Sequence, residues 1–266
     1  MNIKFTSYYL DSPLVYGRVF DVFEPEEITK DVAVFLIHGG GWREGSRTEY
    51  HKLMEEFCNR GYIVASTDYR LDAPDAFTQL KDIREAYDRF VSILKEKNRP
   101  LKIATHGSSA GAHLCSLITL ALPGECGDVC ELKNEWVRPY KCALQATPVD
   151  FLPWEAMMPI TWGMFTSIAG VSYDDNPDVY QRLSMKNYIN DNNTPIFFQE
   201  AEFEHMFPSE LTLEIAKKHR AMDIASHWKV YEKMEHGFIF ALERKAQKEA
   251  FDDMCLFFED KLETDI

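Results

Sequence analysis

The chain has 266 residues, 45% of them hydrophobic, and a formal net charge of -14 with an isoelectric point near 5.0. This acidic balance argues against nucleic acid or anionic membranes as partners, because both need a cationic binding surface. A chain of this length can form one domain with a substantial core, so we expect a single domain over residues 1–266. No apolar stretch approaches the roughly 18 residues of a membrane span, and the N-terminus lacks the apolar segment of a signal peptide. We therefore expect a cytoplasmic protein, unless a signal peptide has been removed.

Hydrophobic periodicity divides the chain into alternating strands and helices. The pattern predicts eight strands, near residues 3–10, 14–23, 32–38, 62–68, 102–106, 141–147, 195–200 and 227–233. It predicts helices over 48–60, 76–97, 109–122, 209–222 and 241–262. Strands that alternate with helices after an opening hairpin indicate the α/β class, with a mostly parallel sheet covered on both faces.

The first motif with chemical meaning follows the apolar strand at 32–37. That strand ends in the run His38–Trp42, which reads HGGGW. Glycines leave backbone N–H groups uncovered, and acyl-transfer enzymes use such groups to stabilise the oxyanion of a tetrahedral intermediate. The predicted donors are the N–H groups of Gly40 and Gly41, together with that of Ala110 further along the chain.

The second motif lies where the strand at 102–105 turns into a helix. Residues 107–111 read GSSAG, which is the G-x-S-x-G pattern of a nucleophile elbow. The turn is tight, so the residues two before and two after the serine must be nearly free of side chain, and both are glycine. Ser109 is therefore the predicted nucleophile, and its Oγ should stand above the sheet edge beside the first N–H groups of the helix.

Six cysteines raise the question of disulfides or a metal. Four of them, Cys58, Cys115, Cys142 and Cys255, lie in apolar helix or strand patterns and are interpreted as core residues. Cys126 and Cys130 are close enough in sequence to pair or to bind a metal, but no second cysteine or histidine cluster lies near them. We expect no metal and no organic cofactor.

Residues 151–194 interrupt the alternation of strands and helices and form a candidate lid. Trp154, Met158 and Trp162 supply adaptable apolar surface there, and we expect them, with Trp42 from the glycine-rich run, to contact the substrate. The alternative is that the segment packs on the sheet, or that its apolar residues form the interface of a homo-oligomer.

A histidine follows the last predicted strand, where a general base is expected. His236 lies in the segment Glu235–Phe238, just after the strand near 227–233. With serine first and histidine last, the chain order matches the Ser-acid-His order of one serine-hydrolase fold and no other common triad order.

Taken together, these motifs resemble those of α/β-hydrolase esterases that carry an HGGGW oxyanion loop. The resemblance covers nearly the whole chain and includes Asp68-Tyr69-Arg70 after the next strand. The sequence resembles the small carbohydrate acetylesterase and feruloyl-esterase-like group more than the hormone-sensitive-lipase-like esterases, and kynurenine formamidase is another relative. Only 37 residues precede His38, where the lipase-like relatives carry a long cap, and their typical D-P-L-x-D segment does not occur.

The acid of the triad is where this sequence departs from the resemblance. Related esterases commonly show H-G-x-x-D-x-x-V-P after the penultimate strand, and an alignment on Pro208 places Glu204 at the aspartate position. Glutamate can orient a histidine as aspartate does. Glu202 and Asp150 are the alternatives.

The sequence therefore predicts a serine carboxylesterase that hydrolyses short-chain acyl esters, including acetyl esters of carbohydrates, through Ser109, His236 and Glu204. The small-molecule ester is the expected partner. Two alternatives stay open: an arylformamidase-like amidase, and a non-catalytic protein of the same fold.

Overall fold

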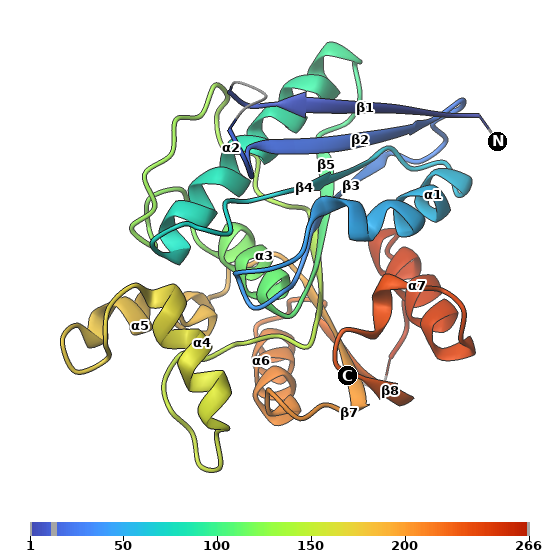
Figure 1. Ribbon diagram of the computed structural model, residues 1–266. Coiled ribbons are helices and arrows are strands. Elements are labelled where there is room, and N and C mark those ends of the chain that lie inside the picture. Colours follow the sequence, from blue (N-terminus) through green and yellow to red (C-terminus); the bar gives the residue numbers. More distant parts are fainter. Residues whose placement is uncertain (1, 12–14, 265–266) are drawn as a thin grey trace.

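The computed structural model describes residues 2–11 and 15–264, and these form one eight-stranded sheet with helices on both faces (Figure 1). The strands are β1 (Ile3–Tyr9), β2 (Val19–Pro25), β3 (Val32–Ile37), β4 (Val64–Thr67), β5 (Lys102–Ser108), β6 (Lys141–Gln145), β7 (Ile196–Phe203) and β8 (His227–Glu235). The predicted mostly parallel sheet is confirmed.

The second strand begins later than the sequence pattern indicates. β2 starts at Val19 and not near 14, because Gly17 has a φ of +73° and turns the chain just before it. The start of the predicted strand, residue 14, lies outside the described residues. A Cβ at Gly17 would come within 2.7 Å of the Arg70 backbone, so this turn has no room for a side chain.

The strand order is β1-β2-β4-β3-β5-β6-β7-β8. β2 pairs antiparallel with β1 and β4, and every other pair is parallel. The carboxyl ends of parallel strands meet at one edge of a sheet. The loops after β3, β5, β7 and β8 therefore converge there, and these loops carry the predicted site residues.

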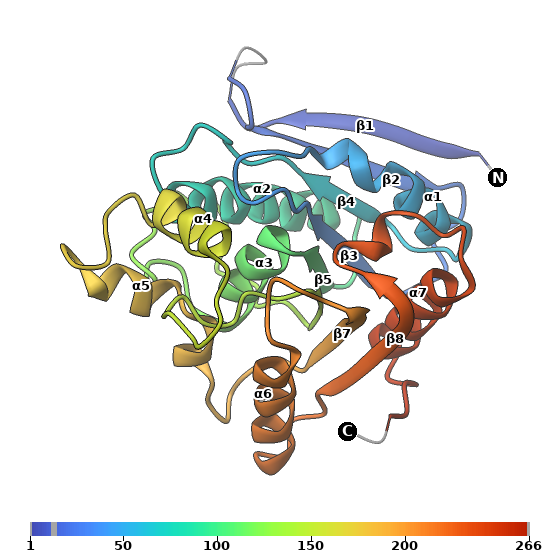
Figure 2. The same cartoon turned by 60° about the horizontal axis from the view of Figure 1, so that its bottom comes forward.

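Two helical layers bury the two faces of the sheet (Figure 2). On one face, α2 (Ala76–Glu96), α3 (Ala110–Leu120) and α6 (Ser209–Ala221) contribute to one cluster of buried side chains. On the other, α1 (His51–Asn59) and α7 (Lys245–Phe258) contribute to a second cluster. The 3₁₀ turns η1 (Arg47–Tyr50) and η3 (Phe238–Phe240) precede α1 and α7. The predicted helix at 241–262 is shorter at both ends, since α7 begins at Lys245 and ends at Phe258.

The segment predicted as a lid contains two short helices and a 3₁₀ turn. These are α4 (Pro159–Ala169), α5 (Pro177–Leu183) and η2 (Met185–Tyr188), and both α-helices begin with proline, whose fixed φ suits a first helical position. The Phe165 ring of α4 stacks on Phe151, with ring centroids 4.0 Å apart. In both views α4 and α5 lie at the end of the molecule next to α3.

Within residues 2–11 and 15–264, none of the helices combines the length and apolar content needed to cross a bilayer. The cytoplasmic location stays a prediction.

All six cysteines are free thiols, and Cys115 Sγ and Cys142 Sγ are 3.6 Å apart in the core. In the same part of the chain, no group of three histidine, cysteine or carboxylate side chains is arranged to hold a metal ion.

Candidate active site

The serine of the GSSAG motif stands at a strained turn between β5 and α3. Ser109 has φ 56° and ψ -123°, a conformation that L-residues rarely adopt. The flanking glycines are required because a side chain would clash with the backbone. A Cβ at Gly107 would lie 2.4 Å from the Gly111 carbonyl oxygen, and one at Gly111 would lie 2.2 Å from the Ile37 carbonyl oxygen. The turn is held further by a 2.9 Å hydrogen bond from the Ser109 N–H to the Gln145 carbonyl.

Neighbouring strand ends bring a histidine and a carboxylate to this serine. His236 follows β8 directly, and its Nε2 lies 2.9 Å from Ser109 Oγ. Glu204 follows β7, and its Oε2 and Oε1 lie 2.8 and 3.0 Å from His236 Nδ1. A register shift between β7 and β8 near Ala201 and Phe203 occurs just before the two side chains meet.

The two other candidate acids are engaged elsewhere. Glu202 is exposed and its Oε2 accepts a 2.7 Å hydrogen bond from the Lys233 N–H. Asp150 lies after β6 and pairs with Lys186, while its Oδ1 accepts from the Leu152 N–H at 3.0 Å. Of the three carboxylates, Glu204 is therefore the one within hydrogen-bond distance of His236.

The surroundings of Glu204 favour its ionised form. Burial alone would raise the pKa of this carboxyl, since its side chain is only 3% exposed, but the hydrogen bond and charge of His236 bring the pKa below the ordinary value. The N–H groups of Met206 and Phe207 also point at Oε1, at 2.8 and 3.4 Å. A carboxylate held this way can fix the ring of His236 and stabilise its charged form.

The glycine-rich loop after β3 lies against the nucleophile. A Cβ at Gly39 would come within 2.7 Å of the Ser108 carbonyl oxygen and 3.5 Å of Ser109 Cβ. Gly40 and Gly41 have φ of +105° and +55°, and a Cβ at Gly40 would lie 2.2 Å from the Glu44 carbonyl oxygen. Positive φ favours glycine at positions 40 and 41, and the close contact with Ser108 favours it at position 39.

Three backbone N–H groups are free at this point. Ala110 is the first residue of α3, so its N–H has no partner within the helix. Over the described ranges 2–11 and 15–264, the N–H groups of Ala110, Gly40 and Gly41 donate to no other group. They are uncovered donors from a helix N-terminus and a glycine-rich loop, which are the kinds of group that can stabilise an oxyanion.

Two of the four residues expected to contact the substrate have packing partners within the protein. Trp42 is only 1% exposed, and its Nε1 donates a 3.2 Å hydrogen bond to His113 Nδ1. Its φ of 63° follows two glycines with positive φ, so the backbone turns this side chain inward. Trp162 stacks on Tyr180, with centroids 5.5 Å apart, and packs between α4 and α5. The expectation for Trp42 is corrected, because its ring is part of the core. Trp162 is half-buried, and its contact with substrate stays a prediction.

The other two line a cavity of about 210 Å³ beside Glu204. Its walls are Trp154 and Met158 from the segment after β6 and residues 204–208 from the loop after β7. Phe207, in this wall, lies 5.7 Å from the His236 ring, centroid to centroid. Nothing in the sequence pattern separated Phe207 from an ordinary core residue.

Met164 is a second residue that sequence reasoning missed. A Cβ at Gly41 would lie 3.2 Å from Met164 Sδ, so α4 reaches the glycine-rich loop. Arg43 fastens the same two segments, because its guanidinium donates to the Ser167 carbonyl at 2.7 Å and to the Ala73 carbonyl at 2.5 Å. Arg43 therefore ties the glycine-rich loop to α4 and to the segment that contains Ala73.

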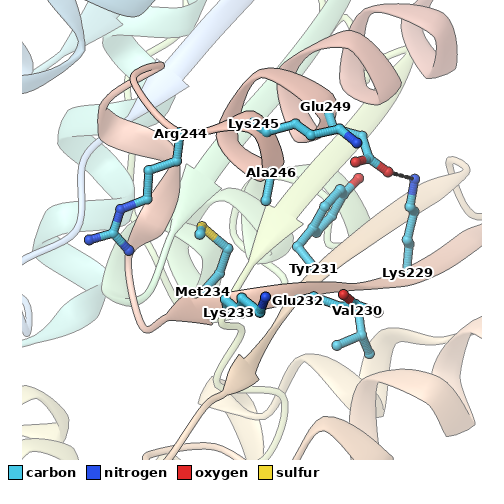
Figure 3. A pocket seen from close by; sticks show the side chains of 10 residues that line it. All are labelled: Lys229, Val230, Tyr231, Glu232, Lys233, Met234, Arg244, Lys245, Ala246 and Glu249. Carbon is cyan, nitrogen blue, oxygen red and sulfur yellow. Dashed lines mark hydrogen bonds and ion pairs between the residues drawn. The ribbon is translucent and has the colours of Figure 1, made fainter.

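A larger cavity of about 700 Å³ lies between β8 and the start of α7 (Figure 3). Lys229 in its wall bonds Glu249 at 2.8 Å, as Figure 3 shows. None of Ser109, His236 and Glu204 lines this cavity. Its position at the sheet edge separates it from the convergent groups, so its size does not make it the candidate site.

One buried carboxyl near the site belongs to Glu200. Glu200 on β7 is 1% exposed, and its Oε1 accepts a 2.8 Å hydrogen bond from Thr212 Oγ1 of α6. Burial raises the pKa of Glu200 to about 8, helped by the charge of Glu204, while the Thr212 bond works in the opposite direction. This group is therefore a neutral acid at pH 7.

This raised pKa predicts a pH-dependent stability. Folded Glu200 keeps its proton up to about pH 8, whereas the unfolded chain releases it near the ordinary value of 4.5. Stability of the wild type should therefore fall as pH rises through that window, by a total on the order of a few kcal/mol. Glu200→Gln, which is always neutral, should match the wild type near pH 5 and exceed its free energy of unfolding at pH 9.

Urea unfolding of both proteins across that range measures the effect. Glu214→Gln, a change at an exposed position of α6, is the control and should leave the pH dependence as it is. Parallel curves for wild type and Glu200→Gln would show that Glu200 ionises at an ordinary pH.

The structure is similar to esterase B from Lactobacillus rhamnosis, with a TM-score of 0.79 and 18% identity over 97% of this chain and 85% of that chain. It is similar to Thermogutta terrifontis esterase 2, with a TM-score of 0.75 and 17% identity over 98% and 96%. A bifunctional GH43-CE protein of Bacteroides eggerthii matches with a TM-score of 0.73 and 19% identity, over 96% of this chain and 37% of that one.

The sheet order, the strained serine turn and these similarities define an α/β-hydrolase fold. Within that class, the chain belongs to the BD-FAE family, whose model matches residues 20–218. A search of curated proteins found no match.

Proposed function

We propose that the protein is a serine carboxylesterase in which Ser109, His236 and Glu204 form the catalytic triad. One observation carries this: an unbroken series of hydrogen bonds runs from Ser109 Oγ through His236 to Glu204, beside three uncovered N–H groups. A nucleophile, a base within reach of it, an acid that orients the base and donors for an oxyanion are the complete set for acyl transfer.

Each group has a defined role in the reaction. Ser109 Oγ attacks the ester carbonyl while His236 Nε2 takes its proton, and the N–H groups of Gly40, Gly41 and Ala110 hold the resulting oxyanion. The intermediate then expels the alcohol, which receives that proton from His236, and leaves an acyl group on Ser109. Water, deprotonated by His236, attacks the acyl-enzyme, and release of the acid restores the serine hydroxyl. These steps call on no metal and no organic cofactor.

The proposed substrates are short-chain acyl esters, with acetyl esters of carbohydrates as the physiological candidates. The cavity beside Glu204, about 210 Å³, is small. Among similar structures are a carbohydrate esterase from gut microbiota, with a TM-score of 0.73 and 17% identity, and the Thermogutta esterase with butyrate bound. Both similarities support the proposal through the shared fold.

A chain-length series tests the acyl preference. We expect kcat/KM for p-nitrophenyl esters to be highest from acetyl to butyryl and to fall for octanoyl and longer chains. Each methylene that the pocket cannot accept should cost on the order of 1 kcal/mol in transition-state binding. Rates that rise steadily with chain length would favour a lipase-like enzyme instead.

The two alternatives are separated by direct assays. An acetyl ester and an N-formyl aryl amine, assayed side by side, distinguish the esterase from an arylformamidase-like amidase. Fluorophosphonate labelling of Ser109 tests the non-catalytic alternative, because only an activated serine reacts. We expect labelling, with the ester turned over faster than the formamide.

A further inference from the structure

The oxyanion loop holds an unfavourable backbone conformation that the rest of the protein must maintain. Gly40, Gly41 and Trp42 have consecutive φ values of +105°, +55° and +63°. For a tryptophan, a positive φ is unfavourable and persists only where the surroundings enforce it. Whatever fixes Trp42 therefore also fixes the neighbouring glycine N–H groups.

Both hydrogen-bonding ends of Trp42 are anchored in the core. Gln79 Nε2, from α2, donates a 2.8 Å hydrogen bond to the Trp42 carbonyl. At the other end, Trp42 Nε1 donates to His113 Nδ1 at 3.2 Å. The indole also packs edge-on against the stacked pair of rings Phe151 and Phe165, at 5.7 and 5.9 Å between centroids.

His113 belongs to the helix that carries the third oxyanion donor. It lies on α3, which begins at Ala110, and its backbone N–H bonds the Ser109 carbonyl at 3.1 Å. The His113–Trp42 bond thus joins the two segments that supply the oxyanion hole. The mutual position of these segments decides whether their N–H groups converge on one oxygen.

The chemistry of His113 permits this bond in one protonation state. Its ring is fully buried, and Nε2 lies 2.8 Å from the Leu183 carbonyl, to which it must donate. That leaves Nδ1 as an acceptor, as the indole N–H requires. Burial lowers the pKa of His113 to about 4, so the neutral ring persists at physiological pH.

We propose that His113 is a positioning residue, which locks the oxyanion loop onto the nucleophile helix through Trp42 and so aligns the N–H groups of Gly40, Gly41 and Ala110. The proposal rests on the esterase function proposed above. It also gives the segment after β6 a second role, because Leu183, Phe151 and Phe165 hold the His113–Trp42 pair from that side.

Two replacements of His113 separate positioning from simple packing. In His113→Asn, Oδ1 takes the place of Nδ1 and still accepts from Trp42, while the bond to Leu183 is lost. In His113→Gln, the amide reaches the Leu183 carbonyl and the Trp42 indole loses its acceptor. We expect His113→Gln to lower kcat for p-nitrophenyl acetate by about 10- to 100-fold with KM nearly unchanged, and His113→Asn to stay within about threefold of wild type.

Trp42→Phe provides an independent variant, because it removes the indole N–H and leaves an aromatic ring in place. It should lower kcat by a similar factor, and combining it with His113→Gln should add little further loss, since both delete the same bond. This variant also decides the question if His113→Gln does not fold.

His219→Asn is the matched control. His219, on α6, is likewise fully buried, and its Nδ1 lies 2.8 Å from Ser226 Oγ. This pair is not part of the site. It should lower the melting temperature and leave kcat unchanged. Equal kcat for wild type, His113→Gln and Trp42→Phe would overturn the positioning role while the esterase function stands. Absence of turnover in the wild type itself would overturn both.

Discussion

Ser109→Ala is expected to lower kcat for p-nitrophenyl acetate by at least about 10⁴-fold and to leave the fold intact. Alanine has the same Cβ as serine, so it meets the same backbone cost at φ 56° and ψ -123° and no new contact. Only Oγ is lost, and with it the atom 2.9 Å from His236 Nε2. Steady-state kinetics, with circular dichroism to check folding, measures the effect.

Ser108→Ala is the matched control one residue away. The Ser108 hydroxyl bonds Gln145 Oε1 at 2.5 Å in the core and does not reach His236. Its loss should reduce stability by roughly 1–3 kcal/mol and change kcat only a few-fold. Turnover by Ser109→Ala close to that of the wild type would rule out the triad.

Glu204→Gln should lower kcat by roughly 10³- to 10⁴-fold while substrate binding stays largely intact. The amide is nearly the same size as the carboxylate, but it removes the charge that stabilises protonated His236. It can also turn its NH₂ toward Nδ1 and hold the wrong tautomer. The pH profile of kcat, compared with that of the wild type, reports the change in the histidine.

Glu202→Gln is the control two residues earlier, near the end of β7. Glu202 is exposed and bonds the Lys233 N–H, so its replacement should keep kcat within about tenfold of wild type. A larger loss in Glu202→Gln than in Glu204→Gln would show that the acid was wrongly assigned. The esterase proposal would survive that result, because Ser109 and His236 would still be paired.

Much of the fold could be predicted because local patterns are tied to local backbone geometry. The strands from β3 onward and helices α2, α3 and α6 lie within a few residues of their predicted limits. The ends of β2 and α7 were less predictable. The positive φ of Gly17 precedes the late start of β2, and α7 covers only Lys245–Phe258. Hydrophobic periodicity reveals neither limit, because it does not resolve turn geometry or the exact ends of a helix.

The choice of Glu204 as the acid of the triad rested on a sequence alignment alone. Three carboxylates lay at plausible places in the chain, and only the position of Pro208 favoured Glu204. The structure brings Glu204 to 2.8 Å from His236 Nδ1 because β7 and β8 are parallel neighbours whose loops leave from the same edge. That adjacency depends on strand order, which separate strand patterns do not reveal.

The sequence by itself determined those features in which the backbone conformation of a residue restricts which amino acid can stand there. Glycines at 40, 41, 107 and 111 stand where positive φ or close backbone contact excludes a side chain, and they identify the two loops and the serine between them. Tertiary structure alone decided where side chains point. The φ of Trp42 turns its indole into the core toward His113, and Trp162 packs on Tyr180, whereas Trp154 faces a cavity. An aromatic residue is equally suited to a core or to a pocket, so the helices and loops packed around it settle which one it lines.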